Sequence, residues 1–204
     1  MRRPAALLAA GLILSGCGTS QYEHQGTVER GASGVGGYVH NGAEQIRLGN
    51  YDRAIELLTI AINHEPTRDD AYYHRGIAHH LKGDIDLALE DLGDAVRVNL
   101  HNSRAWFKRG WIQQNNRARF QDALKDYTRA VEEDPAYADA YYFRGLTYQA
   151  IRVFHRAADD MAKALAVCPL GWDFKAEAEL KLAICRKQST TEGSDRDPLP
   201  TNPR

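Results

Sequence analysis

The chain has 204 residues, with 26 Lys and Arg against 27 Asp and Glu, and a formal net charge of −1 at pH 7. This near-neutral balance, without a basic stripe, argues against nucleic acid as a partner. The length suits one elongated domain.

The first sixteen residues, 1–16, are typical of an export signal. Arg2 and Arg3 give a positive start, and residues 5–14 form an apolar run of ten. A bilayer-spanning helix needs about 20 residues, so this run is too short to span and favours a signal peptide. The run leads into Leu-Ser-Gly-Cys, which ends at Cys17 and resembles the lipobox of bacterial lipoproteins.

That resemblance implies that Cys17 becomes the mature N-terminus and carries a diacylglyceryl thioether and an N-acyl chain such as palmitate. Several acyl chains anchor a protein firmly, whereas one chain binds marginally. Gly18 follows instead of the Asp that the enterobacterial sorting pattern links to inner-membrane retention, so we expect the outer membrane, facing the periplasm. Residues 17–34 predict a flexible tether. The alternative is a soluble exported protein with a chance cysteine.

A repeated pattern of small residues follows. Four times a Gly precedes an Ala by twelve or thirteen residues, and a second Ala comes seven residues later. The sets are Gly42/Ala54/Ala61, Gly76/Ala88/Ala95, Gly110/Ala123/Ala130 and Gly145/Ala157/Ala164. The glycines are 34, 34 and 35 residues apart, with one residue inserted after Gly110. This period predicts stacked helical hairpins, because small residues let two helices approach closely.

The segments Tyr72–Gly76, Trp106–Gly110 and Tyr141–Gly145, with the alanine pairs and Pro66, Pro135 and Pro169 after them, resemble the tetratricopeptide repeat (TPR) family. The resemblance implies an all-α fold, a right-handed superhelix of antiparallel helix hairpins over residues 35–171. The four units are 35–68, 69–102, 103–137 and 138–171. In the first unit, the opening helix has to begin among Gly34, Val35, Gly36 and Gly37, which are poor helix formers.

Residues 172–187 predict a capping helix with Ala176, Leu180, Ala183 and Ile184 on one side. A solenoid needs such a cap, since its last repeat otherwise leaves an apolar face in water. Residues 188–204, with three prolines, predict a disordered tail.

Charged residues recur in register within the repeats. Arg75, Arg109 and Arg144 precede the repeat glycines, and Asp91, Asp126 and Asp160 follow sixteen or seventeen residues later; the first unit has Asn41 and Leu57 instead. This joint presence and absence predicts an Arg–Asp pair between the two helices of a hairpin. Ordinary solvated charges are the alternative.

Motifs for chemistry are missing from the sequence. There is no HExxH, GxSxG or P-loop, and the eight histidines lack ligand spacing, so we expect no enzyme activity, cofactor or metal. Cys168 and Cys185 are predicted to be free thiols, because the intervening helix would span about 20 Å. A disulfide remains possible only if that helix breaks.

The resemblance also implies a partner-binding groove on the first helix of each hairpin. Its residues are Tyr73, His74, Ile77, Arg104, Phe107, Lys108, Trp111, Gln114, Tyr142, Phe143, Leu146 and Gln149. Aromatic side chains beside Arg104 and Lys108 suit a protein or peptide segment with acidic edges. The alternative is that these aromatics pack between hairpins. The carboxylate clamp of chaperone-binding relatives is not reproduced, since Val39, Ala43 and His74 replace its asparagine and lysine.

Together these features predict a membrane-anchored TPR scaffold that binds partner proteins in the bacterial cell envelope. It resembles the NlpI-type lipoproteins, which hold peptidoglycan hydrolases and envelope proteases together. One alternative is a pilotin-like assembly lipoprotein for a pilus or secretion system. Another, of a different class, is an envelope enzyme with its site in the tether or tail.

Overall fold

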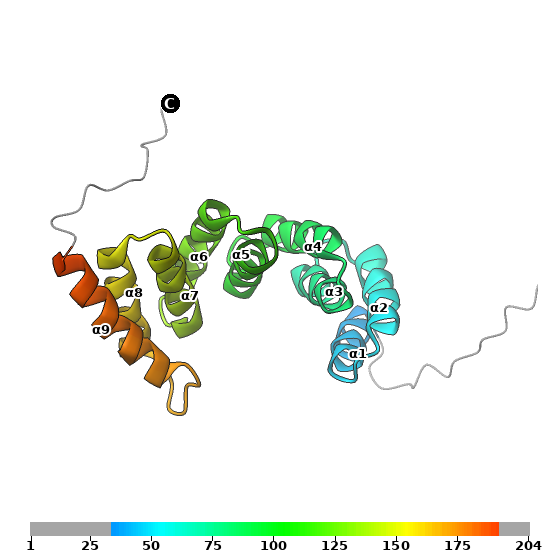
Figure 1. Cartoon of the computed structure of the whole chain (residues 1–204). Helices are drawn as coiled ribbons and strands as arrows, with labels where there is room; N and C mark the ends of the chain where they lie inside the picture. Colours follow the sequence, from blue (N-terminus) through cyan, green and yellow to red (C-terminus); the bar gives the residue numbers. More distant parts are fainter. Residues whose placement is uncertain (1–33, 192–204) are drawn as a thin grey trace, which may run out of the picture. The chain divides into compact units, whose positions relative to one another are not determined.

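The computed structural model describes residues 34–191, except for the side chains of Arg117 and Thr191. These residues form helices and connecting turns, with no strand among them. In chain order the helices are α1 (Val35–Arg47), α2 (Tyr51–His64), α3 (Asp69–Lys82), α4 (Ile85–Val98), α5 (Ser103–Arg117), α6 (Phe120–Glu133), α7 (Ala138–Ala150), α8 (Phe154–Val167) and α9 (Lys175–Thr191). Four hairpins and a final helix follow one another in Figure 1, which confirms the all-α prediction.

The segments that carry the predicted anchor lie outside the described residues. These are the signal peptide, Cys17 and the tether up to residue 33, together with residues 192–204 of the tail. No helix from residue 34 to residue 191 combines the length and the apolar character that crossing a bilayer requires.

Each hairpin closes where small residues meet. In α4 the buried residues Ala88, Leu92 and Ala95 form one stripe at helical spacing, turned toward α3. A Cβ on Gly76 of α3 would lie 3.0 Å from Leu92 Cγ and 3.2 Å from the Ala88 carbonyl oxygen. A side chain at this position would push its neighbours away by a few tenths of an ångström, so glycine favours the close contact between α3 and α4 despite its cost of about 1 kcal/mol in a helix.

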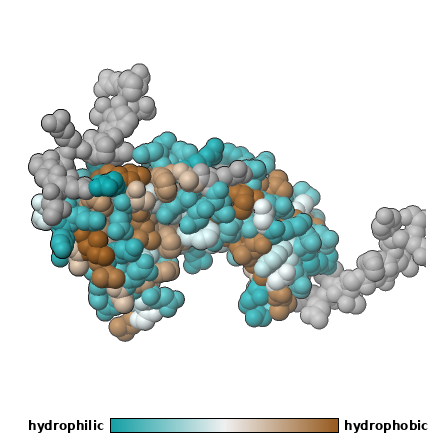
Figure 2. All heavy atoms as spheres, in the orientation of Figure 1, coloured by the Kyte–Doolittle hydropathy of each residue, from teal (hydrophilic) through white to brown (hydrophobic). Residues whose placement is uncertain are grey.

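The hairpins also contact their neighbours along the row. Each second helix packs on the first helix of the next hairpin, and α1 contacts α3 as α5 contacts α7. Because of these contacts, the first helices lie along a common face, which positions the candidate groove. Most of the molecular surface seen in Figure 2 is hydrophilic, with separate apolar patches.

The inserted residue lengthens α5 to 15 residues, where α3 has 14. The turns that close the hairpins each contain one residue with positive φ, namely Gly49, Gly83, Ala118 and Arg152. Ala118 has φ 48° and lies one residue later in its repeat than the others, in agreement with the predicted insertion after Gly110. The opening helix α1 does begin at Val35 and includes Gly36 and Gly37.

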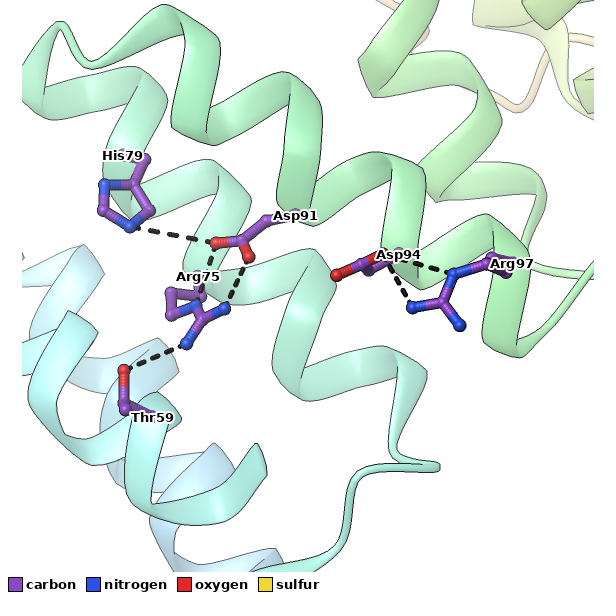
Figure 3. Close-up of polar contacts among 6 residues, drawn as sticks. All are labelled: Thr59, Arg75, His79, Asp91, Asp94 and Arg97. Carbon is purple, nitrogen blue, oxygen red and sulfur yellow. Dashed lines mark hydrogen bonds and ion pairs between the residues drawn. The ribbon is translucent and has the colours of Figure 1, made fainter. Parts of the chain in front are cut away.

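The predicted Arg–Asp pairs are present in all three hairpins that contain the residues. In α3 and α4, Arg75 donates from Nε and Nη2 to the two carboxylate oxygens of Asp91, at 2.9 and 2.6 Å (Figure 3). Arg109 and Asp126 repeat this geometry at 2.7 Å for both bonds. The third pair is Arg144 with Asp160, at 2.8 and 2.7 Å.

These pairs lie between helices with little exposure to water. The aspartate side chains are 5–6% exposed, and the arginine side chains are 13–22% exposed. Burial raises the pKa of Asp126 and Asp160, and the hydrogen bonds from their arginines oppose that rise. The bidentate contacts satisfy both oxygens of each carboxylate, so the pairs orient the two helices of a hairpin.

Two of the arginines also reach the preceding hairpin. Arg75 Nη1 donates to Thr59 Oγ1 at 3.1 Å, and Arg144 Nη1 donates to Thr128 Oγ1 at 3.2 Å. The equivalent position before Arg109 is Gly93, which has no hydroxyl. This third partner was not predicted from the sequence, although Thr59, Gly93 and Thr128 occupy equivalent positions in their repeats.

The capping helix differs from its prediction in bounds and in its packed face. It begins at Lys175, three residues later than predicted, and continues to Thr191, so residues 188–191 are helical and not part of a disordered tail. Its buried residues are Ala178 and Cys185, with Leu182 packed beside them. The predicted face is exposed instead, with Leu180 at 60% and Ile184 at 38%.

Cys168 and Cys185 are free thiols, the first at the end of α8 and the second within the unbroken helix α9. Cys185 is fully buried, and this burial raises the pKa of its thiol. The Cys168 thiol is partly exposed and contacts the Leu165 carbonyl oxygen at 3.3 Å.

Candidate protein-binding groove

Half of the predicted groove residues form one accessible strip on α3 and α5. We call this the cationic strip: Tyr73, His74, Ile77, Arg104, Lys108 and Trp111. Arg104 is exposed, and the other five are half-buried. The strip therefore combines aromatic area with basic groups that a partner can reach.

Lys108 and Trp111 form one end of the strip, where a cation lies over an aromatic ring. The Lys108 ammonium lies 4.5 Å from the centroid of the Trp111 ring. His80 meets the same ring edge-on, with centroids 5.4 Å apart. These contacts fix the indole from two sides, so Trp111 can offer a rigid apolar surface.

The basic groups of the strip have no acidic partner within the described residues. Arg104 and Lys108 make no ion pair there, whereas Arg75, Arg109 and Arg144 are all bidentate with aspartates. Burial lowers the pKa of the Lys108 ammonium. An incoming carboxylate would stabilise this charge, since an opposite charge nearby favours the ionised form.

A small cavity opens at the other end of the strip. It has a volume of about 300 Å³ and is lined by Asp70, Tyr73 and His74 of α3 and by residues 101–104 before and in α5. Burial lowers the pKa of His74, and nearby Asp70 acts in the opposite direction. The cavity suits a small polar side chain of a bound segment.

The loop beneath this cavity is held by residues that were not predicted from the sequence. Asn102 Oδ1 accepts a hydrogen bond from the Ala105 amide at 2.9 Å and so caps α5. Its Nδ2 donates to Asp69 Oδ2 at 2.6 Å, and Asn99 Nδ2 donates to the same oxygen at 3.1 Å. A Ser/Asn/Asp position before a helix would have identified the cap, but the link to Asp69 depends on the tertiary fold.

Four predicted groove residues pack between hairpins. Tyr142 is buried, so its assignment to a ligand surface is wrong, whereas Phe107, Phe143 and Gln114 are half-buried and their assignment stays a prediction. Tyr142 is 1% exposed, and its ring stacks on Phe174 at 4.9 Å. Phe107 contacts Tyr137 and Phe143, with ring centroids 5.0 and 5.6 Å away. These rings fill the junction of the third hairpin, the fourth hairpin and the cap.

Gln114 is the fourth of these residues. Its Oε1 lies 2.9 Å from the Tyr127 hydroxyl and 2.7 Å from the Thr147 hydroxyl. Thr147 is fully buried, so this amide ties α5 to α6 and α7. Leu146 and Gln149 of α7 are half-buried and lie outside the cationic strip.

A larger groove lies over the second helices, α6 and α8. Its volume is about 1300 Å³, and Arg109, Asp126, Arg144 and Asp160 form part of its lining. Because those four residues are paired with one another, a ligand there would have to compete with existing ion pairs. Size alone therefore does not make it the better candidate.

Groups that could hold a metal ion are not found between residues 34 and 191, where no three His, Cys, Asp or Glu side chains come together suitably. What the geometry does provide is a stack of helix hairpins with a partly exposed strip for recognition. This combination defines a class of repeat scaffold suited to protein–protein interaction.

Comparison with known proteins assigns the family. The tetratricopeptide repeat model matches residues 42–97 and 116–168, together more than half of the chain. The chain therefore belongs to the tetratricopeptide repeat family. Human tetratricopeptide repeat protein 6 is 31% identical over 121 residues, which is 59% of this chain and 23% of that protein. Mouse tetratricopeptide repeat protein 36 is 35% identical over 94 residues, which is 44% of this chain and 50% of that protein.

The chain thus spans about a quarter to a half of these relatives. Among solved structures, a tetratricopeptide repeat protein from Parabacteroides merdae has a TM-score of 0.64 at 22% identity, over 77% of this chain and 60% of that one. MamA from Desulfovibrio magneticus has a TM-score of 0.59 at 20% identity, over 80% of this chain and 99% of that one. The first TPR of Spaghetti (RPAP3), bound to the HSP90 peptide SRMEEVD, has a TM-score of 0.55 at 24% identity, over 58% of this chain and 93% of that one. These likenesses support the fold.

Proposed function

We propose that this protein is a membrane-anchored adaptor that holds an acidic segment of a partner protein along the cationic strip. The observation that carries the proposal is that Arg104 and Lys108 make no ion pair within residues 34–191, whereas Arg75, Arg109 and Arg144 are each paired with an aspartate. A segment with Asp or Glu would complete these two charges while its apolar side chains cover Trp111 and Ile77.

The repeat fold supports this choice of ligand. A structural neighbour carries the peptide SRMEEVD, which contains three acidic residues, on the same kind of helical scaffold. The clamp residues of such relatives are absent from the first hairpin of this chain, where Val39 is buried. The proposed segment therefore binds across α3 and α5, with a chemistry set by the cationic strip.

A peptide titration tests the strip. A fluorescein-labelled acidic peptide, such as SRMEEVD, and its neutral form with Gln and Asn in place of the acids serve as probes for fluorescence anisotropy. We expect selection of the acidic peptide, weakening at high salt, and at least about tenfold weaker binding for Arg104→Glu. Arg129→Glu, on the exposed side of α6, is the matched control. Equal binding of both peptides would contradict the acidic-segment proposal.

The anchor belongs to the same proposal. Cys17 after the apolar run supports lipidation, and Gly18 supports the outer membrane facing the periplasm. The mass of the protein from its native membrane is expected to show cleavage before Cys17 and added acyl chains. A Cys17→Ser variant is expected to stay unprocessed and unacylated. A native chain that keeps Met1 and is recovered in the aqueous phase of a detergent partition would refute the anchor.

The envelope role extends to the class of partner. NlpI-type lipoproteins combine an acyl anchor with helical repeats, and we propose a similar role here, holding cell-wall hydrolases or proteases at the membrane. Affinity capture from detergent-solubilised envelopes, with the Arg104→Glu chain as the control bait, tests this role. Capture of pilus or secretion components instead would favour the pilotin-like alternative.

A further inference from the structure

Helix α9 has two apolar faces, and only one of them packs on the repeats. Ala178, Leu182 and Cys185 lie against the preceding hairpin. The opposite face is exposed, and we call it the outer stripe. Its apolar residues are Ala176, Leu180, Ala183 and Ile184, and the exposed Lys187 continues the same face one turn after Ala183.

The outer stripe has the spacing of a helix–helix seam. Ala176, Leu180 and Ala183 are separated by four and three residues, as in the a and d positions of a heptad. Two of these residues are alanines, which allow a second helix to approach closely. Apolar surface is visible over the α9 region in Figure 2. An exposed stripe of this kind at the end of a repeat stack indicates a protein contact.

Charged residues beside the outer stripe favour a second copy of α9 as its binding partner. Glu179 and Arg186 are both exposed and are seven residues apart, so they lie on the same side of the stripe, two turns from each other. In an antiparallel pair of α9 helices, Glu179 of one copy faces Arg186 of the other, and the reverse pair forms by symmetry. A parallel pair brings neither contact together.

We propose that the outer stripe joins two copies of this chain through an antiparallel α9–α9 contact. Such a contact is self-complementary about a two-fold axis, as most homodimer contacts are. The dimer presents two cationic strips, so a partner with two acidic segments, or a dimeric partner, binds with increased effective concentration. The inference does not depend on the ligand proposed for the strip.

Sedimentation equilibrium on the full chain tests the contact, with Cys17→Ser as the background to exclude acylation. We expect a monomer–dimer equilibrium, and Leu180→Glu is expected to raise its dissociation constant at least about tenfold. Leu87→Glu is the matched control, because Leu87 is a helical leucine with 47% exposure on α4. Circular dichroism establishes that each variant keeps its helices.

Charge reversal tests the antiparallel arrangement. Glu179→Arg and Arg186→Glu are each expected to weaken self-association, whereas a mixture of the two variants is expected to regain it, because both cross-pairs are then opposite in charge. A monomer at all concentrations, or a dimer unaffected by Leu180→Glu, would overturn the proposal. So would a mixture that fails to associate, or a chain that dimerises only after residues 192–204 are removed.

Discussion

Arg109 and Asp126 show how a buried charge pair organises each hairpin. The two side chains are 22% and 5% exposed and share two hydrogen bonds of 2.7 Å. Their charges were detectable in the sequence because the repeat supplies three examples and one joint absence. The threonine at the third corner was not detectable in this way, because Gly93 interrupts the pattern.

Removing one partner of this pair is expected to cost more than removing both. Asp126→Ala leaves Arg109 as an uncompensated, largely buried cation, at a cost of about 3–5 kcal/mol in the free energy of unfolding. A double-mutant cycle with Arg109→Ala, followed by urea denaturation, is expected to give a coupling of about 1–3 kcal/mol. Arg129 and Glu132, an exposed pair on α6, provide the control, with coupling below about 1 kcal/mol. Zero coupling for the buried pair would mean that its geometry contributes no stability.

Two glycines in the same hairpin are expected to respond oppositely to Ala. At Gly76, a Cβ meets Leu92 and the Ala88 carbonyl within 3.2 Å, so α3 and α4 must separate, and we expect a loss of about 1–2 kcal/mol. At Gly93, the nearest atom is Arg109 Nη1 at 3.7 Å, so the helix-propensity gain of about 0.5–1 kcal/mol remains. Urea midpoints of Gly76→Ala and Gly93→Ala measure both. Stabilisation by Gly76→Ala would show that the helices do not need glycine there.

At the scale of elements, the repeat helices were predictable and the cap was only partly so. Each repeat helix has a single apolar stripe at fixed spacing, and the hairpin neighbours follow from the period. Helix α9 has two stripes, and periodicity alone does not say which one the repeats cover. The aromatic residues Trp172 and Phe174, which precede α9, pack in one cluster with Ala178, while Cys185 packs against Phe154 and Ala158 of α8 in a second cluster.

The same aromatics explain the misassigned part of the groove. The family position of Tyr142 is a ligand contact, but Trp172 and Phe174 cover that ring here. Trp172 is held by a hydrogen bond from its Nε1 to Asp139 Oδ1 at 2.6 Å. Because these residues belong to no repeat, comparison among the repeats could not reveal their contact.

The docking of α9 is measurable through Cys185. This thiol is fully buried with a raised pKa, so alkylation requires the helix to move away from α8. In a chain with Cys17→Ser and Cys168→Ala, Phe174→Ala is expected to accelerate alkylation of Cys185 at least about tenfold, because it removes the stacking on Tyr142. Leu180→Ala, on the exposed face, is the control. Fast alkylation of the parent chain would contradict a stably docked cap.

At the scale of the whole molecule, stacking turns local patterns into a surface for recognition. Tyr73 and His74 are 30 or more residues from Arg104 in the sequence, yet they line one cavity with it. Family resemblance identified the positions, and the structure separates those that a partner can reach from those that hold hairpins together. In the proposed role, lipidation of Cys17 attaches the chain to the membrane, and the cationic strip binds the partner.

The most direct test of the adaptor role is site-specific photo-crosslinking in the native cell. A photoreactive phenylalanine at Ile77, in the cationic strip, is expected to crosslink to a discrete partner protein, and Arg104→Glu is expected to abolish the product. The same probe at Leu87, on α4, is expected to give no such product. Identical products from both positions, or none that depend on Arg104, would contradict a partner-binding strip on the first helices.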